Sequence, residues 1–292
     1  MSIIKSFSVG NGDMFYINHG SDNFTMIDCC VNEDNADRIL GEIKTLKSKK
    51  KISRFISTHP DEDHLRGLEL LEKTVGIENF YCVRNSAIKD DETVSFQKYC
   101  YLRDSEKAFY VYKGCSRKWM NIEDNEIGSS GINILWPDVN NSDFKTALTD
   151  AANGGSPNNI SPIISYSLGG GASVLWMGDL ETEFMKLVEN NLTLNQVDIL
   201  FAPHHGRDSG KIPSSILEKI NPKIIVVGEA RSDHLHYYPD YNTITQNSAG
   251  DIVFCCEGDK VHVFTSKNYE VDFLDDENRQ YNNMNYLGTL NL

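Results

Sequence analysis

The order of apolar runs along this 292-residue chain predicts an α/β fold, with two mixed β-sheets and helices on their outer faces. Short strand-like runs come first, helical and strand-like patterns then alternate, and the same order follows again in the second half. No low-complexity linker separates the halves, so we expect one domain over residues 1–268. Residues 269–292 are polar and Asn-rich, and we expect them to form a loosely held tail.

The first half of the chain begins with strands and continues with two helices. Three apolar runs separated by Gly, Asn and Asp turns are the expected strands, at residues 3–9, 14–18 and 24–29. Apolar residues then recur at helical spacing over 33–46, and Asn32 can cap this helix. A strand over 52–57 leads into the segment "STHPDEDHLRG". The helix that follows has one apolar face, made of Leu65, Leu68, Leu71 and Val75.

The second half resumes the pattern after residues 85–130, which carry no clear periodicity. The expected strands lie at 132–136, 163–168, 173–177, 197–201, 223–227, 252–256 and 261–265. The expected helices lie at 181–190, 213–220 and 241–246. Several polar motifs directly follow these strands, and α/β folds usually place their sites at such strand ends.

Charge and cysteine content narrow the class of protein. The net charge is −14, so the chain should repel nucleic acid at long range unless basic residues gather locally or metal ions offset the charge. The seven cysteines show no CxxC spacing, which favours reduced, buried thiols. No apolar run approaches the roughly 18 residues of a membrane span, and the N-terminus lacks a signal-peptide pattern. We therefore expect no membrane contact and a cytoplasmic protein.

The segment "HPDEDH" concentrates metal-binding side chains between a strand and a helix. His59, Asp61 and Asp63 share one side of an extended loop, and His64 follows at the helix start. Such a compact group of nitrogen and oxygen donors suits divalent transition metals. The plainer interpretation is a pair of helix-capping carboxylates beside two incidental histidines, and Asp63 can itself cap the helix.

The distribution of the other histidines favours the metal-binding interpretation. Six of the eight histidines fall in three short clusters, which are His59/His64, His204/His205 and His234/His236. The last two clusters each follow a hydrophobic strand, as does the Gly178–Asp179 pair in "VLWMGD". Because strands of one sheet end at a common edge, we expect these side chains to meet there.

These motifs carry a resemblance to a known fold. The chain opens with "VGNGD" (9–13) and "MIDCC" (26–30), and "HPDEDH", "NNIS", "MGD", "PHHG" and "VVGE…DHLH" follow in order. In this order, over roughly residues 3–265, the motifs resemble those of the metallo-β-lactamase fold. Within it they resemble the soluble hydrolase domain of the ComEC competence (DNA-uptake) proteins. The resemblance implies a four-layer αβ/βα sandwich and a dinuclear metal centre.

The resemblance also assigns ligands. One ion would be bound by His59 and Asp61. The other would be bound by Asp63, His64 and one of His204 and His205, with His205 favoured. Asp179 would bridge the two ions.

Four further residues are expected beside the ligands. Asp28 would orient a ligand histidine through its distal N–H, and Asp13 is expected in the same outer layer. Asn158 and Asn159 stand where many relatives supply a third histidine to the first ion. The first site is therefore oxygen-rich, which favours Mn²⁺ or a mixed pair of ions over tightly bound Zn²⁺.

The implied function is a dinuclear metal-dependent hydrolase, most of all a phosphodiesterase or nuclease that uses a water held between the ions. Asp63 would adjoin the attacking water. His234 or His236 would contact a phosphate or protonate the leaving group, unless both lie in a polar surface turn. The substrate would be a phosphodiester, a nucleic acid or a nucleotide.

A basic, aromatic segment at 97–119 is the candidate substrate-binding rim. Its cations Lys113, Arg117 and Lys118 would contact phosphates, and its aromatic rings would stack on bases. The plainer interpretation is that the aromatics pack inward and the cations are solvated. Two other functions remain open. One is hydrolysis of a small ester, lactone or amide; the other is a weakly active or non-catalytic metal-binding partner of another protein.

Overall fold

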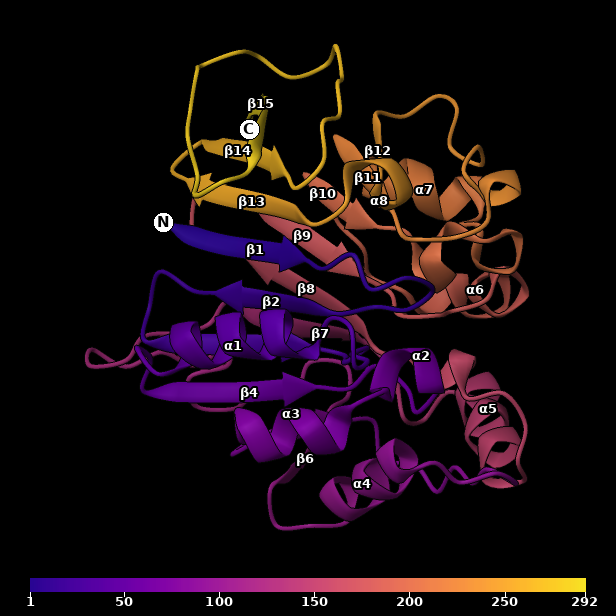
Figure 1. The fold of residues 1–292 in the computed structure, drawn as a ribbon. Coiled ribbons are helices and arrows are strands. Elements are labelled where there is room, and N and C mark those ends of the chain that lie inside the picture. Colours follow the sequence, from indigo (N-terminus) through magenta and orange to yellow (C-terminus); the bar gives the residue numbers. More distant parts are fainter.

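The computed structural model describes the backbone of residues 1–292 and every side chain except that of Ser232. Its strands form two mixed sheets that face each other (Figure 1). The first sheet, in spatial order, contains β15 (Asn285–Asn291), β14 (Lys260–Thr265), β13 (Ile252–Glu257), β1 (Ser2–Ser6), β2 (Phe15–Asn18), β3 (Asn23–Ile27), β4 (Ile52–Ile56), β5 (Phe80–Cys82) and β6 (Ala108–Tyr110). The second contains β12 (Thr243–Thr245), β11 (Ile224–Val227), β10 (Ile199–Phe201), β9 (Ser173–Trp176), β8 (Ile163–Ser167) and β7 (Ile132–Trp136).

Each sheet joins an antiparallel part to a parallel part. In the first sheet β3 to β6 run parallel, and the remaining neighbours pair antiparallel. In the second sheet β9 to β12 run parallel, and β7, β8 and β9 pair antiparallel. The parallel parts bring the carboxyl ends of β3 and β4 to the same region as those of β9 and β10. The site described below is built there.

Helices cover the outer face of each sheet. The helices on the first half of the chain are α1 (Ala36–Lys47), α2 (Glu62–Leu65), α3 (Leu68–Thr74) and α4 (Val94–Arg103). Those on the second half are α5 (Ser142–Ala152), α6 (Thr182–Val188), α7 (Ser214–Ile220) and α8 (Gln246–Ala249). Short 3-10 turns are η1 (Asn158–Ile160), η2 (Glu189–Asn191), η3 (Pro203–Gly206), η4 (Asp208–Gly210) and η5 (Ser232–His234). This arrangement of two helix layers around two mixed sheets confirms the predicted fold class.

Successive side chains of β2 point to opposite faces of the first sheet, so this strand contributes to two hydrophobic cores. Phe15 and Ile17 point into the core between the sheets, whereas Tyr16 points into the core beneath α1 and α3. Phe15 packs against Trp176 and Phe201 of the opposite sheet, with ring centroids 6.2 and 4.8 Å apart. Because Trp176 and Phe201 end β9 and β10, these contacts hold both strand ends in place.

Three sequence predictions need correction. Residues 241–246 do not form a helix, because they lie in β12 and the start of α8. The C-terminal segment is not a loose tail throughout, since β15 pairs with β14 at the sheet edge. Asn32 does not cap α1; its Oδ1 accepts the N–H groups of Asp34 and Asn35 in the preceding turn. In the part of the chain that the structure describes, no helix is long and apolar enough to cross a bilayer.

Candidate metal centre

Four strand ends bring the predicted ligands together. Asp28 follows β3, the "HPDEDH" segment follows β4, Asp179 follows β9, and His204 and His205 lie in η3 after β10. The strand ends belong to both sheets, so the cluster spans the seam between them. The expectation that these motifs meet at one edge agrees with this placement.

Asp179 lies at the centre of the cluster and is buried. Its Oδ1 is 3.1 Å from Nε2 of His64. Its Oδ2 faces the Nε2 atoms of three other histidines, which are His59 at 3.8 Å, His204 at 3.7 Å and His205 at 3.7 Å. One carboxylate thus faces four imidazoles, with its two oxygens on different sides. This is the position that a ligand shared by two ions requires.

The two aspartates of the motif lie beside different histidines of this centre. Asp61 Oδ2 is 3.7 Å from His59 Nε2, and Asp63 Oδ2 is 3.4 Å from His205 Nε2. Lys89 forms an ion pair with the other oxygen of Asp61. Asp63 lies in the first turn of α2, whose N-cap is Asp61, and no side-chain cap bond forms there. The capping role suggested for Asp63 is therefore wrong.

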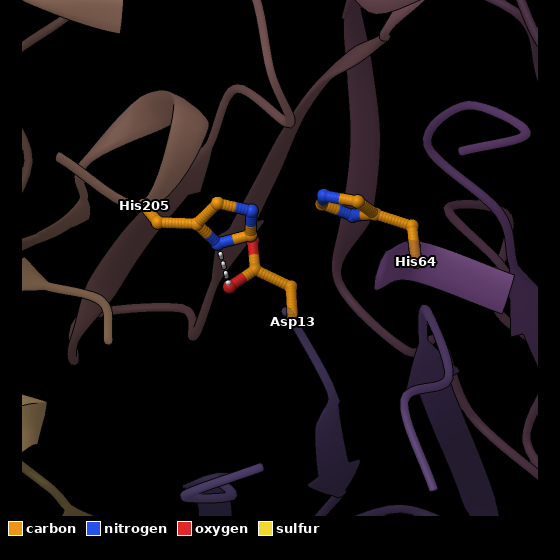
Figure 2. A group of neighbouring side chains, drawn as sticks. All are labelled: Asp13, His64 and His205. Carbon is orange, nitrogen blue, oxygen red and sulfur yellow. Dashed lines mark hydrogen bonds and ion pairs between the residues drawn. The ribbon is translucent and has the colours of Figure 1, made fainter. Parts of the chain in front are cut away.

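Two of the histidines are held by carboxylates. His64 Nδ1 donates to Asp28 Oδ2 at 2.8 Å, and Asp28 is fixed in turn by the backbone N–H and hydroxyl of Thr58. His205 Nδ1 contacts Asp13 Oδ1 at 3.1 Å, and Figure 2 shows the His64 ring facing this pair from α2. Because Nδ1 of each ring contacts a carboxylate, Nε2 is the nitrogen that faces the centre and that could bind an ion once it has lost its proton.

His59 is held by hydroxyl groups instead. Its Nδ1 lies 3.1 Å from Thr58 Oγ1 and 3.3 Å from Ser161 Oγ. The Ser161 hydroxyl also accepts the backbone N–H of Asp179 at 3.2 Å. Gly178 makes this approach possible: its φ is +53°, and an added Cβ would lie 2.7 Å from the Ser161 side chain.

The charges of the cluster are strongly coupled. Burial disfavours a charged His64, but the carboxylates of Asp179 and Asp28 outweigh burial and hold the pKa of its imidazole well above the usual value. Burial likewise opposes charge on His205, yet Asp13 and Asp179 raise its pKa to about 10. The pKa of Asp179 is held well below its usual range, because neighbouring imidazoles outweigh its burial. The site thus attracts positive charge into its centre.

The donor atoms fit divalent ions. Among the described residues, the buried atoms without a hydrogen-bond partner include Nε2 of His59, His64 and His205 and Oδ1 of Asp179. Leaving such atoms unpaired is costly in a folded protein. Two overlapping groups have ligand atoms within 4.8 Å of one another: Asp13, His64 and His205, and His59, His64 and Asp179. A mixture of imidazole nitrogens and carboxylate oxygens of this kind suits Zn²⁺ or Mn²⁺.

The asparagines that replace the third histidine bind a glutamate. Asn159 Nδ2 donates to Glu181 at 2.8 Å and its Oδ1 accepts the Glu181 N–H at 3.1 Å. Asn158 Nδ2 is 3.3 Å from the same carboxylate. These contacts hold η1 against the start of α6, next to the loop that carries Asp179.

The two histidines after β11 differ in position. His234 lines a pocket of about 630 Å³ together with Gly10, Asn11, Arg207, Glu229, Ala230, Arg231 and Asn247. His236 is exposed and packs against the ring of Tyr237, with centroids 4.9 Å apart. The pocket adjoins the cluster, because Arg207 Nη1 lies 3.4 Å from His204 Nε2. Only His234 of this pair therefore stays in the candidate site.

The structure does not bring the basic segment to the cluster. Arg117 stacks over Tyr81 and Phe109 and donates to Asn79, which precedes β5 at the opposite end of the sheet. Lys118 pairs with Asp124 at 3.1 Å, and Lys113 donates to the Asn191 carbonyl at 2.8 Å. These three cations contact other segments of the chain, and their assignment to a substrate-binding rim stays a prediction.

Sequence reasoning missed two cations beside the site. Lys89 lies in the segment without periodicity, and nothing in its local pattern points to Asp61. Arg207 directly follows "HHG", and that proximity was a usable signal.

Comparisons with known proteins bear mainly on the fold. No protein-family model matches the chain. ComE operon protein 3 of Bacillus subtilis is 23% identical over 203 residues, which are 69% of this chain and 23% of that protein. The chain thus spans less than a quarter of the length of that curated relative.

Solved structures with related folds include three metalloproteins. Igni18, a metallo hydrolase from the archaeon Ignicoccus hospitalis, matches with a TM-score of 0.50 and 14% identity, over 87% of this chain and 99% of that chain. CmlA, a diiron β-hydroxylase from Streptomyces venezuelae, matches with a TM-score of 0.44 and 12% identity, over 78% and 44% of the respective chains. The metallo-β-lactamase MIM-1 from Novosphingobium pentaromativorans matches with a TM-score of 0.33 and 14% identity, over 68% and 76%. The match to Igni18 covers most of both chains and shows a shared fold, with two mixed sheets between helix layers as the resemblance to the metallo-β-lactamase fold predicts.

Proposed function

We propose that this protein is a dinuclear metal-dependent phosphodiesterase. The observation that carries the proposal is the convergence of four imidazoles on the two oxygens of Asp179, beside a pocket that contains two arginines. Histidines 64 and 205, with Asp63, would bind one ion, and His59 and Asp61 would bind the other. Two bound divalent ions supply Lewis acidity toward the substrate and lower the pKa of water.

The pocket beside the cluster favours an anionic substrate. Arg207 and Arg231 can contact phosphate oxygens, and guanidinium groups suit that geometry. The one carboxylate that lines the pocket, Glu229, already accepts hydrogen bonds from the Ser8 hydroxyl at 2.8 Å and the Gly10 N–H. Its charge is thereby partly compensated, so it repels a phosphate less than a free carboxylate would.

The residues around the reacting phosphorus would divide the proton movements. Nearby imidazoles keep the pKa of Asp63 well below its usual range despite burial, so its carboxylate is ionised and accepts a hydrogen bond from the attacking water. The water oxygen would bond to phosphorus and pass its proton to Asp63, while a phosphorus–oxygen ester bond breaks. His234, in the pocket wall, would donate the proton that the leaving oxygen needs.

The preferred metal and substrate follow from the donor set and the charge. At the first ion two carboxylates, those of Asp61 and Asp179, accompany one assigned imidazole, that of His59. Such an oxygen-rich set favours Mn²⁺ or a mixed pair of ions. The net charge is −14, and Arg117 and Lys118 of the basic segment already contact other residues of the chain. Both facts favour a small phosphodiester, such as a nucleotide, over a long polynucleotide.

A metal-supplementation screen tests the proposal. The chelated protein is assayed with Mn²⁺ or Zn²⁺ on bis-p-nitrophenyl phosphate, nucleotides, single-stranded DNA, RNA and a panel of lactones. We expect turnover of the small phosphodiesters with Mn²⁺ and its loss in Asp179→Ala. Turnover confined to lactones would replace the phosphodiesterase by a small-ester hydrolase. Metal binding without turnover of any of these would favour a non-catalytic role.

A further inference from the structure

The first ion has only one nitrogen donor if only the residues assigned so far bind it. His59 supplies one imidazole, and Asp61 and Asp179 supply oxygens. Lys89 neutralises Asp61 and so weakens that carboxylate as a ligand. The asparagines in the place of a third histidine are committed to Glu181 by three hydrogen bonds. Another donor near Asp179 Oδ2 would complete this site.

We infer that His204 supplies this donor and is a ligand of the first ion. The inference rests on the proposed metal centre. His204 Nε2 lies 3.7 Å from Asp179 Oδ2, and His59 Nε2 lies 3.8 Å from the same oxygen. Two ligand atoms on one tetrahedral ion at zinc-like bond lengths lie roughly 3.4 Å apart. Both imidazoles therefore face the same Asp179 oxygen, and side-chain rotation would bring the two nitrogens onto one ion.

The hydrogen bonds of His204 identify Nε2 as the nitrogen for an ion, which would replace the Arg207 contact there. Its Nδ1 lies 2.9 Å from Ser209 Oγ, and Arg207 Nη1 lies 3.4 Å from its Nε2. A guanidinium group can only donate, so Nε2 must be the acceptor and Nδ1 must carry the proton. The Nε2 lone pair, on the edge that faces Asp179, is the one that a metal ion requires.

The backbone after β10 is shaped to present both histidines. His204 and His205 have φ values of 51° and 56°, a left-handed conformation that is unfavourable for a non-glycine residue. The His204 N–H donates to the carbonyl of Gly178, the residue before Asp179, at 3.0 Å. An added Cβ on Gly210 would lie 2.5 Å from the His204 Cβ, so a glycine makes room for this side chain. Two consecutive left-handed residues are accounted for if both rings bind metal.

Metal titration of the full chain tests the inference without an activity assay. After chelation, Co²⁺ and Mn²⁺ are titrated into wild type, His204→Ala and the matched control His236→Ala, with calorimetry and Co²⁺ absorption as readouts. We expect wild type and His236→Ala to bind two ions. His204→Ala should bind one ion with unchanged affinity and the other about 10- to 100-fold more weakly, with a changed Co²⁺ spectrum. His204→Gln, which keeps the size of the side chain, should show the same selective loss.

The outcomes separate this inference from the proposed function. If wild type takes up no metal, the proposed function fails. If wild type and both His204 variants bind two ions with equal affinities and equal spectra, only the role of His204 is overturned. A loss in Asn158→Ala but not in the His204 variants would also overturn it, and would assign the position to the buried, unpaired Oδ1 of Asn158. Circular dichroism identifies a variant that does not fold, and the other His204 variant then decides.

Discussion

The two halves of the candidate metal centre differ in the groups that contact Nδ1 of their histidines. His64 and His205 each have a carboxylate at Nδ1, Asp28 and Asp13, at 2.8 and 3.1 Å. His59 reaches Asp28 only through the Thr58 hydroxyl, which lies 3.1 Å from its Nδ1 and donates to Asp28 at 2.6 Å. Nδ1 of His204 contacts only the hydroxyl group of Ser209.

This difference predicts unequal sites. A carboxylate behind an imidazole raises its basicity and its strength as a metal ligand, whereas a hydroxyl group does so less. The pKa values follow the same division: carboxylates raise those of His64 and His205, and burial lowers those of His59 and His204. We expect the ion at His64 and His205 to be tightly held and the ion at His59 to exchange more readily.

The largest effect is expected at the tight site. Asp63→Ala should lower kcat by about 10²- to 10⁴-fold, because it removes both a ligand and the acceptor for the attacking water. Asp61→His, the matching change at the weaker site, should retain activity and shift the metal preference toward Zn²⁺. Steady-state assays on bis-p-nitrophenyl phosphate measure both. Full turnover by Asp63→Ala would refute its assigned role.

The next effect compares the carboxylate that contacts His64 with the hydroxyl group that contacts His59. Asp28→Asn should weaken binding of the tight ion about 10- to 100-fold, because it removes the charge behind His64. Thr58→Val breaks the relay to His59 and should weaken mainly the other ion, by less than about tenfold, because the Thr58 N–H still holds Asp28 behind His64. Calorimetric titration with Mn²⁺ resolves the two ions. Equal losses in both variants would remove the distinction between the sites.

The pH dependence of the metal-free protein gives a smaller effect. The pKa of His205 is about 10 in the folded chain, against 6.5 ordinarily, so its proton stabilises the fold fully below pH 6.5. This stabilisation is lost as pH rises through about 10. We therefore expect the Tm of the chelated protein to fall from pH 6.5 toward pH 10, and less so with Mn²⁺ bound. A Tm that rises over this range would contradict the charge assignment.

The smallest effect concerns the basic segment. Lys113 and Lys118 contact Asn191 and Asp124, away from the cluster. Changing both to Ala should alter kcat/KM on a small phosphodiester by less than about twofold. Arg207→Ala, a change of the same kind in the pocket, should raise KM severalfold because it removes a phosphate contact. If the lysine variant instead lost binding to single-stranded DNA, the original rim assignment would be supported.

The fold and the convergence of the candidate ligands were predictable for the same reason. Each motif directly follows an apolar strand, so the strand pattern places His59, Asp179 and His205 at strand ends, and the two sheets bring these ends together. β15 was missed because asparagines and a glycine interrupt its apolar residues, and its pairing with β14 depends on tertiary contact. The helix expected at 241–246 failed for a similar reason, since the parallel contact with β11 makes residues 243–245 a strand.

The contacts between distant segments could not be read from sequence. Nothing local to Lys89 indicates Asp61, and nothing local to Arg117 indicates that Tyr81 and Phe109 receive its guanidinium. The aromatic residues of 97–119 looked equally suited to stacking bases and to packing inward. Only the three-dimensional structure places Arg117 at the far end of the sheet. The cytoplasmic location stays a prediction, with all seven cysteines free in the structure.

Metal stoichiometry tests the central claim most directly. Elemental analysis of the protein after chelation, reloading with Mn²⁺ and removal of free ions should give close to two ions per chain for wild type. Asp179→Ala should retain fewer than one, because its carboxylate faces both positions. A wild-type protein that takes up no divalent metal near neutral pH, or an Asp179→Ala variant that still holds two ions, would contradict the account.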